Sequence, residues 1–114
     1  MTQPAQQSDP DFITVTIDPD LEEIVPVFMR NRRRDVGTLR TALDESDFKT
    51  VRLLGHRMKG DGGGYGFNTI SEIGEVLEQA AIREDRPAIT QQTDRLDDFL
   101  DRVQVVYRKH GHRR

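Results

Sequence analysis

The stretch GHRMKGDGGGYGF, Gly55 to Phe67, decides how this chain folds and where its surface lies open. Five of the seven residues from Gly60 to Gly66 are glycine, and a histidine stands shortly before them. A glycine inside a helix costs about 1 kcal/mol relative to alanine, so packing alone does not explain this run. We therefore expect a helix that frays between Gly62 and Gly66, with bare backbone beside His56 that another protein can approach closely.

On both sides of this stretch, apolar residues recur at spacings of three and four, which predicts four amphipathic helices. Their start signals are an N-cap aspartate, a capping box or a first-turn proline, at Asp18, Asp47, Thr69 with Glu72, and Pro87. Pro26 must kink or split the first segment, because it removes a backbone donor. The inner stripes of the four segments are Leu21, Ile24, Val25, Phe28, Val36, Leu39 and Leu43; Phe48, Val51, Leu54 and Met58; Ile70, Ile73, Leu77, Ala80 and Ala81; and Ile89, Leu96, Phe99, Leu100, Val103, Val106 and Tyr107. Short connections join the helices, so we expect an all-α, antiparallel up-down four-helix bundle with an N-terminal extended arm and a short lead-in helix.

The two ends of the chain differ from this pattern. Residues 1–11 are polar and contain proline, which predicts a disordered arm, and residues 110–114 form a basic, frayed tail around the bundle of residues 12–109. The sequence FITVTI at residues 12–17 alternates as an edge strand does, but no partner strand is evident. We therefore favour an extended lead-in that packs on the bundle.

Composition narrows the class of protein. The 114 residues suffice for one domain with one core, and no apolar run is long enough to span a bilayer. The start lacks the pattern of a secretion signal, and the absence of cysteine excludes disulfides and thiolate zinc sites, so we expect a cytoplasmic protein. A formal charge of −3 argues against general nucleic-acid binding. The basic run RNRRR, Arg30 to Arg34, predicts a solvated helix face, with an anion site as the remaining alternative.

His56 falls to one side of the inner stripe of the second helix and points outward. Its strip of the helix surface also carries Lys49, Arg52, Leu53, Lys59, Gly60 and Gly63. A lone helical histidine is usually an ordinary surface residue. Its combination here with cations and glycines favours a functional histidine instead. A neutral imidazole is a good nucleophile toward phosphoryl groups, and cations offset the charge that such a group brings. Glycines allow a second reactant to approach in line.

These residues resemble the histidine-containing phosphotransfer (Hpt) domains of multistep two-component relays. The family motif H-x-x-K-G, followed by small residues and a G-[FLA] step, is matched by His56, Lys59, Gly60, Gly66 and Phe67. Further matches are Leu77, Glu78, Ala80 and Ala81 downstream, and Phe28, Arg32, Val36, Leu39, Ala42, Leu43, Asp47 and Val51 upstream. The resemblance covers about residues 17–106.

The resemblance implies a role for each matched position. His56 takes the phosphoryl group on Nε2, Lys59 balances its charge, and Glu78 accepts a hydrogen bond from Nδ1–H. Partner contacts are expected along the strip and the glycine run, at Lys49, Arg52, Leu53, Arg57, Gly60, Gly63, Gly64 and Gly66. Asp61 departs from the family, which usually has a small neutral residue there, and a carboxylate at that position is expected to tune partner choice or to weaken phosphate retention.

The resemblance also implies partners and a function. The expected partners are receiver domains of response regulators or hybrid histidine kinases, with the protein as a monomeric phosphocarrier between them. It needs no cofactor, and magnesium is expected only in the partner receiver domain. The alternative is a docking scaffold that no longer transfers phosphate. No room remains for the ATP-binding domain of a kinase.

Two further kinds of site are disfavoured by residue order and spacing. A phosphate-binding loop of the nucleotide-binding type requires its lysine after the glycines, and here the lysine precedes them. A zinc site on His56, His110 and His112 has poor geometry, so we expect no metal and regard the two tail histidines as solvated.

Overall fold

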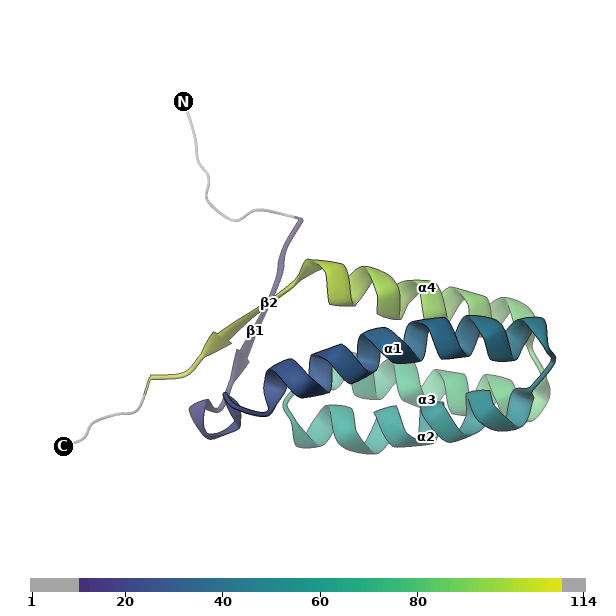
Figure 1. Cartoon of the computed structure of the whole chain (residues 1–114), viewed down its shortest axis with the longest axis horizontal. Helices are drawn as coiled ribbons and strands as arrows, with labels where there is room; N and C mark the ends of the chain where they lie inside the picture. Colours follow the sequence, from purple (N-terminus) through teal and green to yellow (C-terminus); the bar gives the residue numbers. More distant parts are fainter. Residues whose placement is uncertain (1–10, 110–114) are drawn as a thin grey trace, which may run out of the picture.

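The structure, a computed structural model, describes residues 11–109, and within them four helices lie beside a two-stranded sheet (Figure 1). The helices are α1 (Val25–Asp44), α2 (Phe48–Gly64), α3 (Asn68–Arg83) and α4 (Arg86–Arg102). A strand β1 (Ile13–Ile17) and a 3-10 turn η1 (Pro19–Leu21) precede α1, and a strand β2 (Val103–Tyr107) follows α4. The predicted helical bundle is therefore present. The expected arm, apart from Asp11, and the expected tail lie outside the described residues.

Most of the predicted helix starts are found where the sequence indicated them. Asp47 accepts a hydrogen bond from the backbone nitrogen of Thr50 at 3.1 Å, which satisfies a free donor at the start of α2. Pro26 lies in the first turn of α1 and separates this helix from η1, so the expected split occurs there. The predicted capping box at Thr69 is wrong. Helix α3 begins earlier, because Gly66 turns the chain at a φ of +88° and the helix starts directly after Phe67.

The hydrophobic core lies between the four helices. Its fully buried members include Leu39 of α1, Met58 of α2, Leu77 of α3 and Leu96 of α4. Ile24, expected in the core, is largely exposed instead, because it precedes α1 and turns away from the bundle. None of the helices between residues 11 and 109 is both long and apolar enough to cross a membrane.

Helices α2 and α3 approach each other more closely than side chains normally permit, because glycines form the contact. A Cβ added to Gly55 would lie 2.7 Å from the backbone nitrogen of Glu78, and one added to Gly62 would lie 2.6 Å from that of Ser71. On the α3 side, a Cβ added to Gly74 would lie 2.6 Å from the carbonyl oxygen of Gly55. This backbone contact fixes which side chains of the two helices meet.

The sheet corrects two expectations from the sequence. The segment expected to be an unpaired lead-in is β1, and it pairs in parallel with β2, with Ile13 opposite Val103 and Ile17 opposite Tyr107. The fold is therefore not purely α-helical, and the last helix ends at Arg102 instead of continuing to Tyr107. The residues of β2 are mainly β-branched or aromatic, which favours a strand. Alternation in β2 leaves Val106, an expected core residue, 43% exposed.

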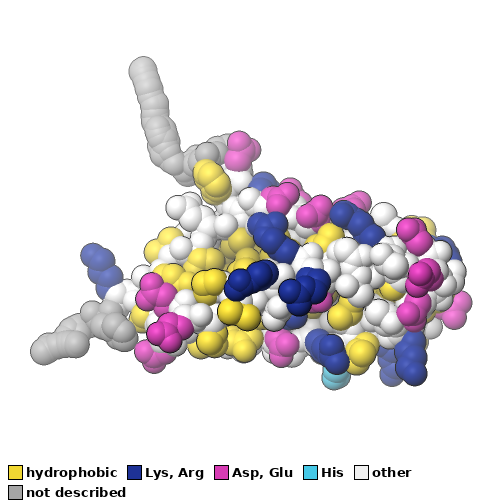
Figure 2. All heavy atoms as spheres, in the orientation of Figure 1, with side chains coloured by type: hydrophobic (Ala, Val, Ile, Leu, Met, Phe, Trp, Pro, Cys, Tyr) yellow, Lys and Arg dark blue, Asp and Glu magenta, His cyan; other side chains and the backbone are white. Residues whose placement is uncertain are grey.

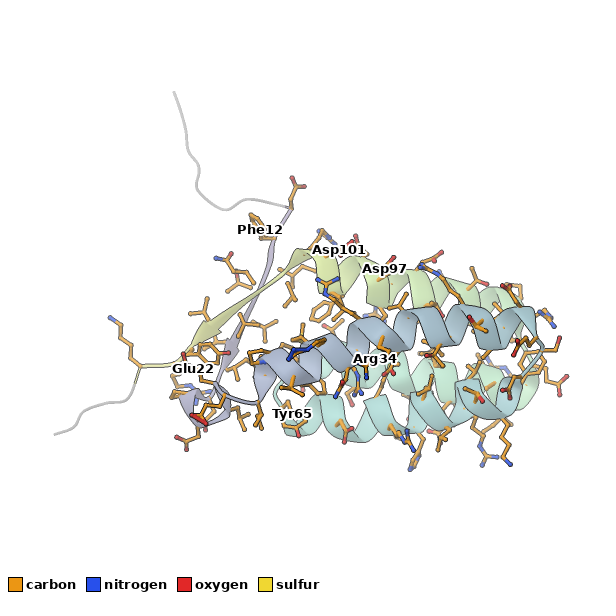
Figure 3. The ribbon with its side chains drawn as sticks, viewed as in Figure 1. Phe12, Glu22, Arg34, Tyr65, Asp97 and Asp101 are labelled. Atoms are coloured by element: carbon orange, nitrogen blue, oxygen red, sulfur yellow. The ribbon has the colours of Figure 1, made fainter. Side chains whose placement is uncertain are left out.

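The basic run on α1 is only partly a solvated face. Arg32 is 9% exposed, its guanidinium lies 4.9 Å from the ring centre of Phe28, and its Nε lies 2.9 Å from Asp35. Its neighbour Arg33 donates a hydrogen bond at 3.0 Å to Asp101 of α4, and Asp101 is labelled on that helix in Figure 3. The solvated-face prediction is therefore wrong for Arg32, because the residue lies one turn after Phe28 on the buried side of α1.

Candidate functional site

His56 lies on the outer side of α2, and its side chain is 69% exposed. Its Nδ1 atom lies 3.0 Å from Oε2 of Glu78, a carboxylate on α3 whose side chain is only 13% exposed. An ionised carboxylate only accepts hydrogen bonds, so this contact holds the proton on Nδ1. Within the described part of the chain Nε2 makes no hydrogen bond, and its lone pair is available to a reactant from solvent.

The glycine contact between the helices explains why so short a bridge is possible. His56 follows directly after Gly55, where an added Cβ would lie 2.7 Å from the backbone nitrogen of Glu78 on α3. A larger residue at position 55 would push the helices apart, because an added Cβ would also lie 2.8 Å from the carbonyl oxygen of Gly74. The rigid helix pair, rather than a loop, therefore sets the angle of the imidazole ring.

Lys59 lies one turn beyond His56 and meets two carboxylates of α3. Its Nζ lies 2.7 Å from Oε1 of Glu75 and 3.7 Å from Oε1 of Glu78. The hydrogen bond to Glu75, followed by the charge of Glu75, raises the pKa of Lys59. Glu78 thus has one oxygen directed to the histidine and the other directed to the lysine. We did not anticipate Glu75 from the sequence, although its position three residues before Glu78 places both on one helix face.

Three of the expected partner-binding residues gather beside the histidine. Lys49, Arg52 and Leu53 line a hollow of about 330 Å³ together with His56 and Glu78. Leu53 is 49% exposed and supplies an apolar wall, while the two cations supply positive charge. Figure 2 shows a histidine at the edge of the molecule beside Lys and Arg side chains. The hollow is therefore basic, partly apolar and open toward solvent.

Four of the five glycines from Gly60 to Gly66 lie outside the close contact with α3 and fall into two groups. A Cβ added to Gly60 or Gly64 would have no neighbour within 4 Å, and one added to Gly63 would meet only the hydroxyl of Ser71 at 3.9 Å. These three leave the last part of the outer side of α2, after Lys59, without side chains at their positions. Gly66 differs, because its positive φ forms the turn into α3 and an added Cβ would lie 2.9 Å from Ile17. The fold itself requires glycine at this last position.

Arg57 and Asp61 lie on the side of α2 that faces α1, apart from the histidine cluster. Burial raises the pKa of the Asp35 carboxyl on α1, and the charges of Arg32 and Arg57 oppose that rise. Oδ2 of Asp61 lies 3.7 Å from Nη1 of Arg32. The unusual carboxylate at position 61 therefore has a local partner in this chain, the largely buried guanidinium.

No site for a metal ion is evident in the part of the chain that the structure covers. Between residues 11 and 109, no three histidine, aspartate or glutamate side chains gather in a suitable cluster. His110 and His112, which we expect to be solvated, lie outside the described residues.

Comparison with known proteins places this geometry in a family. The model of the Hpt domain family matches residues 23–105, which include all four helices. No curated protein and no solved structure matches the chain. The match includes the positions of His56, Lys59 and Glu78, and it begins after β1.

Proposed function

Because the chain belongs to the Hpt domain family, whose members transfer phosphoryl groups through histidine in two-component phosphorelays, we propose that His56 is the residue that carries the phosphoryl group. The protein accepts the group from an aspartate of one receiver domain and passes it to the aspartate of another. The observation that carries this proposal is the imidazole of His56, exposed to solvent and held at Nδ1 by the carboxylate of Glu78 at 3.0 Å.

The transfer step follows from this geometry. The lone pair of Nε2 attacks the phosphorus of an aspartyl phosphate, the bond between phosphorus and the aspartate oxygen breaks, and the carboxylate leaves with the electron pair. The proton stays on Nδ1, so the phosphorylated ring carries a positive charge that Glu78 offsets. Delivery to the second receiver domain is the reverse reaction. Lys59 balances charge on the phosphoryl oxygens, as preorganised cations do in phosphoryl transfer.

The docking surface in this proposal has two parts. The hollow beside the histidine offers Lys49, Arg52 and Leu53 to an acidic partner with an apolar edge. Beyond the histidine, Gly60 and its neighbouring glycines let the backbone of the partner close over the helix. Arg57 contributes at the border toward α1. The positive charge of this surface is complementary to an acidic receiver active site.

The remaining features of the proposal concern the whole protein. The connections between the helices are short, which supports an up-down antiparallel order, and one chain then supplies the complete bundle as a monomer. We expect the protein to work in the cytoplasm with receiver domains of response regulators or hybrid kinases. It uses no resident cofactor in this scheme, and magnesium belongs to the receiver domain.

A transfer assay tests the proposal against the docking-scaffold alternative. The full chain is mixed with receiver domains that carry labelled phosphate, and label is followed on both proteins. We expect rapid transfer to the wild-type chain and none to His56→Gln, with the helical content unchanged. A double variant of His110 and His112 to Gln serves as the control and should accept label normally. Binding to a receiver domain without any transfer would favour the scaffold, and label that persists in His56→Gln would reject the assignment.

A further inference from the structure

Lys59 makes its closest ionic contact with Glu75 of α3 and not with Glu78. Nζ of Lys59 lies 2.7 Å from Glu75, which is 1.0 Å closer than its distance of 3.7 Å from Glu78. In the unphosphorylated protein the cation is therefore directed across to α3 one turn away from the level of His56. Glu75 lies three residues before Glu78, as Lys59 lies three residues after His56, so the two pairs form successive contacts between the helices.

Phosphorylation changes the charge balance at this point. The group added to Nε2 brings on the order of two negative charges to an imidazole that already contacts the carboxylate of Glu78. In the proposed function Lys59 also balances the phosphoryl oxygens, and the charge of Glu75, its closest carboxylate, offsets part of the positive charge that would otherwise act on them. Both members of the existing pair are about half exposed, with side-chain exposures of 47% and 45%, so the pair is exchangeable.

We propose that Glu75 competes with the phosphoryl group for Lys59 and thereby shortens the lifetime of phosphohistidine in this protein. This inference rests on the proposed function of His56. It makes Glu75 a tuning residue, because it acts through Lys59 and does not touch the reacting atoms. A carrier that must both accept and release its phosphoryl group gains from such competition, since a cation fixed on the phosphate would favour retention over release.

Glu75→Gln tests the competition directly, because glutamine keeps the size of the side chain and removes its charge. The full chain is phosphorylated with phosphoramidate, a small donor that needs no receiver domain. Nε2 forms the new bond to phosphorus, and the bond between phosphorus and the donor nitrogen breaks. The donor nitrogen leaves with the electron pair as ammonia. The decay of the phosphohistidine signal is followed by phosphorus NMR, with His56→Gln defining the background from other histidines.

We expect the phosphohistidine half-life to increase about two- to fivefold in Glu75→Gln, the range for loss of one exposed ion pair. Glu72→Gln is the matched control, because it removes a charge from the same helix one turn away, where Glu72 pairs with Arg95 at 3.1 Å. Its half-life should equal that of the wild type. In a Lys59→Met background, Glu75→Gln should have no effect, since the coupling passes through the lysine.

A second readout reports on the lysine itself. Glu75 raises the pKa of Lys59, so a carbon NMR titration of its side chain should show a lower pKa in Glu75→Gln and no change in Glu72→Gln. An unchanged or shorter phosphohistidine half-life in Glu75→Gln overturns the competition, as does a longer one that persists without Lys59. A wild-type chain that takes no phosphoryl group on His56 overturns the proposed function and this inference together, so the two failures are distinguishable.

Discussion

The hydrogen-bond partner of Nδ1 in His56 determines whether Nε2 has a lone pair available for reaction. Glu78 holds Nδ1 of His56 at 3.0 Å, and this contact selects the tautomer in which Nε2 has a free lone pair. In the proposed transfer step the carboxylate neither gives nor takes a proton, so we expect it to contribute orientation and charge. Such a residue should slow the reaction when it is removed, without abolishing it.

We therefore predict that Glu78→Ala reduces the rate of transfer from a phosphorylated receiver domain. The loss of a charge-assisted hydrogen bond is worth roughly 1–3 kcal/mol, which corresponds to about a 5- to 150-fold reduction in rate. Nitrogen NMR of the imidazole should show that the population with the proton on Nδ1 falls in this variant. Glu78→Gln keeps a carbonyl acceptor. It should therefore retain part of the transfer rate and part of the population with the proton on Nδ1. A wild-type rate together with a wild-type tautomer would make Glu78 an ordinary flank residue.

Individual residues differ in how far the sequence could place them. The positions of His56 and Glu78 follow from helical spacing and a family resemblance, and the structure brings them together. Glu75 carried no comparable signal, because a glutamate on a helix flank is common and its partner lies on another helix. The prediction of a solvated face is wrong for Arg32 for a related reason, because its burial depends on packing that the run of arginines does not indicate. A run of arginines predicts a solvated face, and only the three-dimensional packing shows that one of them lies over Phe28.

At the level of the helix pair, the distance between α2 and α3 controls the site. We predict that Gly74→Ala destabilises the protein by about 1–3 kcal/mol or more, because overpacking a tight contact forces the backbones apart. An added Cβ would collide with the backbone of Lys59 and lie 2.6 Å from the carbonyl oxygen of Gly55. Transfer should slow as well, because the same displacement lengthens the contact between His56 and Glu78. Chemical denaturation and the transfer assay measure the two effects.

Gly37→Ala is the matched control for this substitution. Gly37 lies within α1, and an added Cβ would meet nothing within 4 Å. Alanine there should stabilise the protein by about 0.4–1 kcal/mol, since the unfolded chain loses freedom and no contact is disturbed. Equal stability effects at positions 37 and 74 would show that the close contact between the helices carries no strain.

The bare outer surface of α2 supports a separate prediction about docking. Gly60→Leu should reduce transfer from receiver domains by at least tenfold, because its side chain projects into the space that the partner must occupy. The fold should remain, since an added Cβ meets no neighbour within 4 Å. Phosphorylation by phosphoramidate should be unchanged, because this small donor needs no docking surface. Gly37→Leu provides the control for an exposed leucine elsewhere, and retained transfer in Gly60→Leu would place the docking surface on another side.

The helices and the strands differ in how well periodicity predicts them. Spacings of three and four identified the four helices, because each of them buries one long stripe in the core. Helical spacing alone predicts that the last helix continues through the strand Val103–Tyr107, because Val103, Val106 and Tyr107 also fit that spacing. Its partner β1 lies about ninety residues earlier in the chain. No local pattern reports such a pairing, and five residues are too few to show which period applies.

For the whole molecule, the sheet joins the two ends of the described chain. Strand β1 precedes the bundle and β2 follows it, so their pairing closes the chain upon itself at one end of the helices (Figure 1). The inner faces of both strands, with Val15 and Val105 opposite each other, pack against the core. Ile17 at the end of β1 is buried and lies against Gly66, so the sheet also supports the turn that follows the glycine run.

The same sheet makes the oligomeric state worth measuring. Paired strands with free outer edges can recruit another chain, and short strands with polar outer side chains oppose such recruitment. Both strands here have only five residues, and Thr14, Thr16 and Gln104 are exposed. Most apolar side chains of the helices are meanwhile buried within one chain, and the exposed ones, Val27, Leu53 and Ile82, lie on three different helices. We therefore predict a monomer of 13.1 kDa by size-exclusion chromatography with light scattering at micromolar concentration. A stable species of twice that mass would contradict this prediction. Val106→Lys, which places a charge on the exposed face of β2, would then show whether the sheet forms the interface.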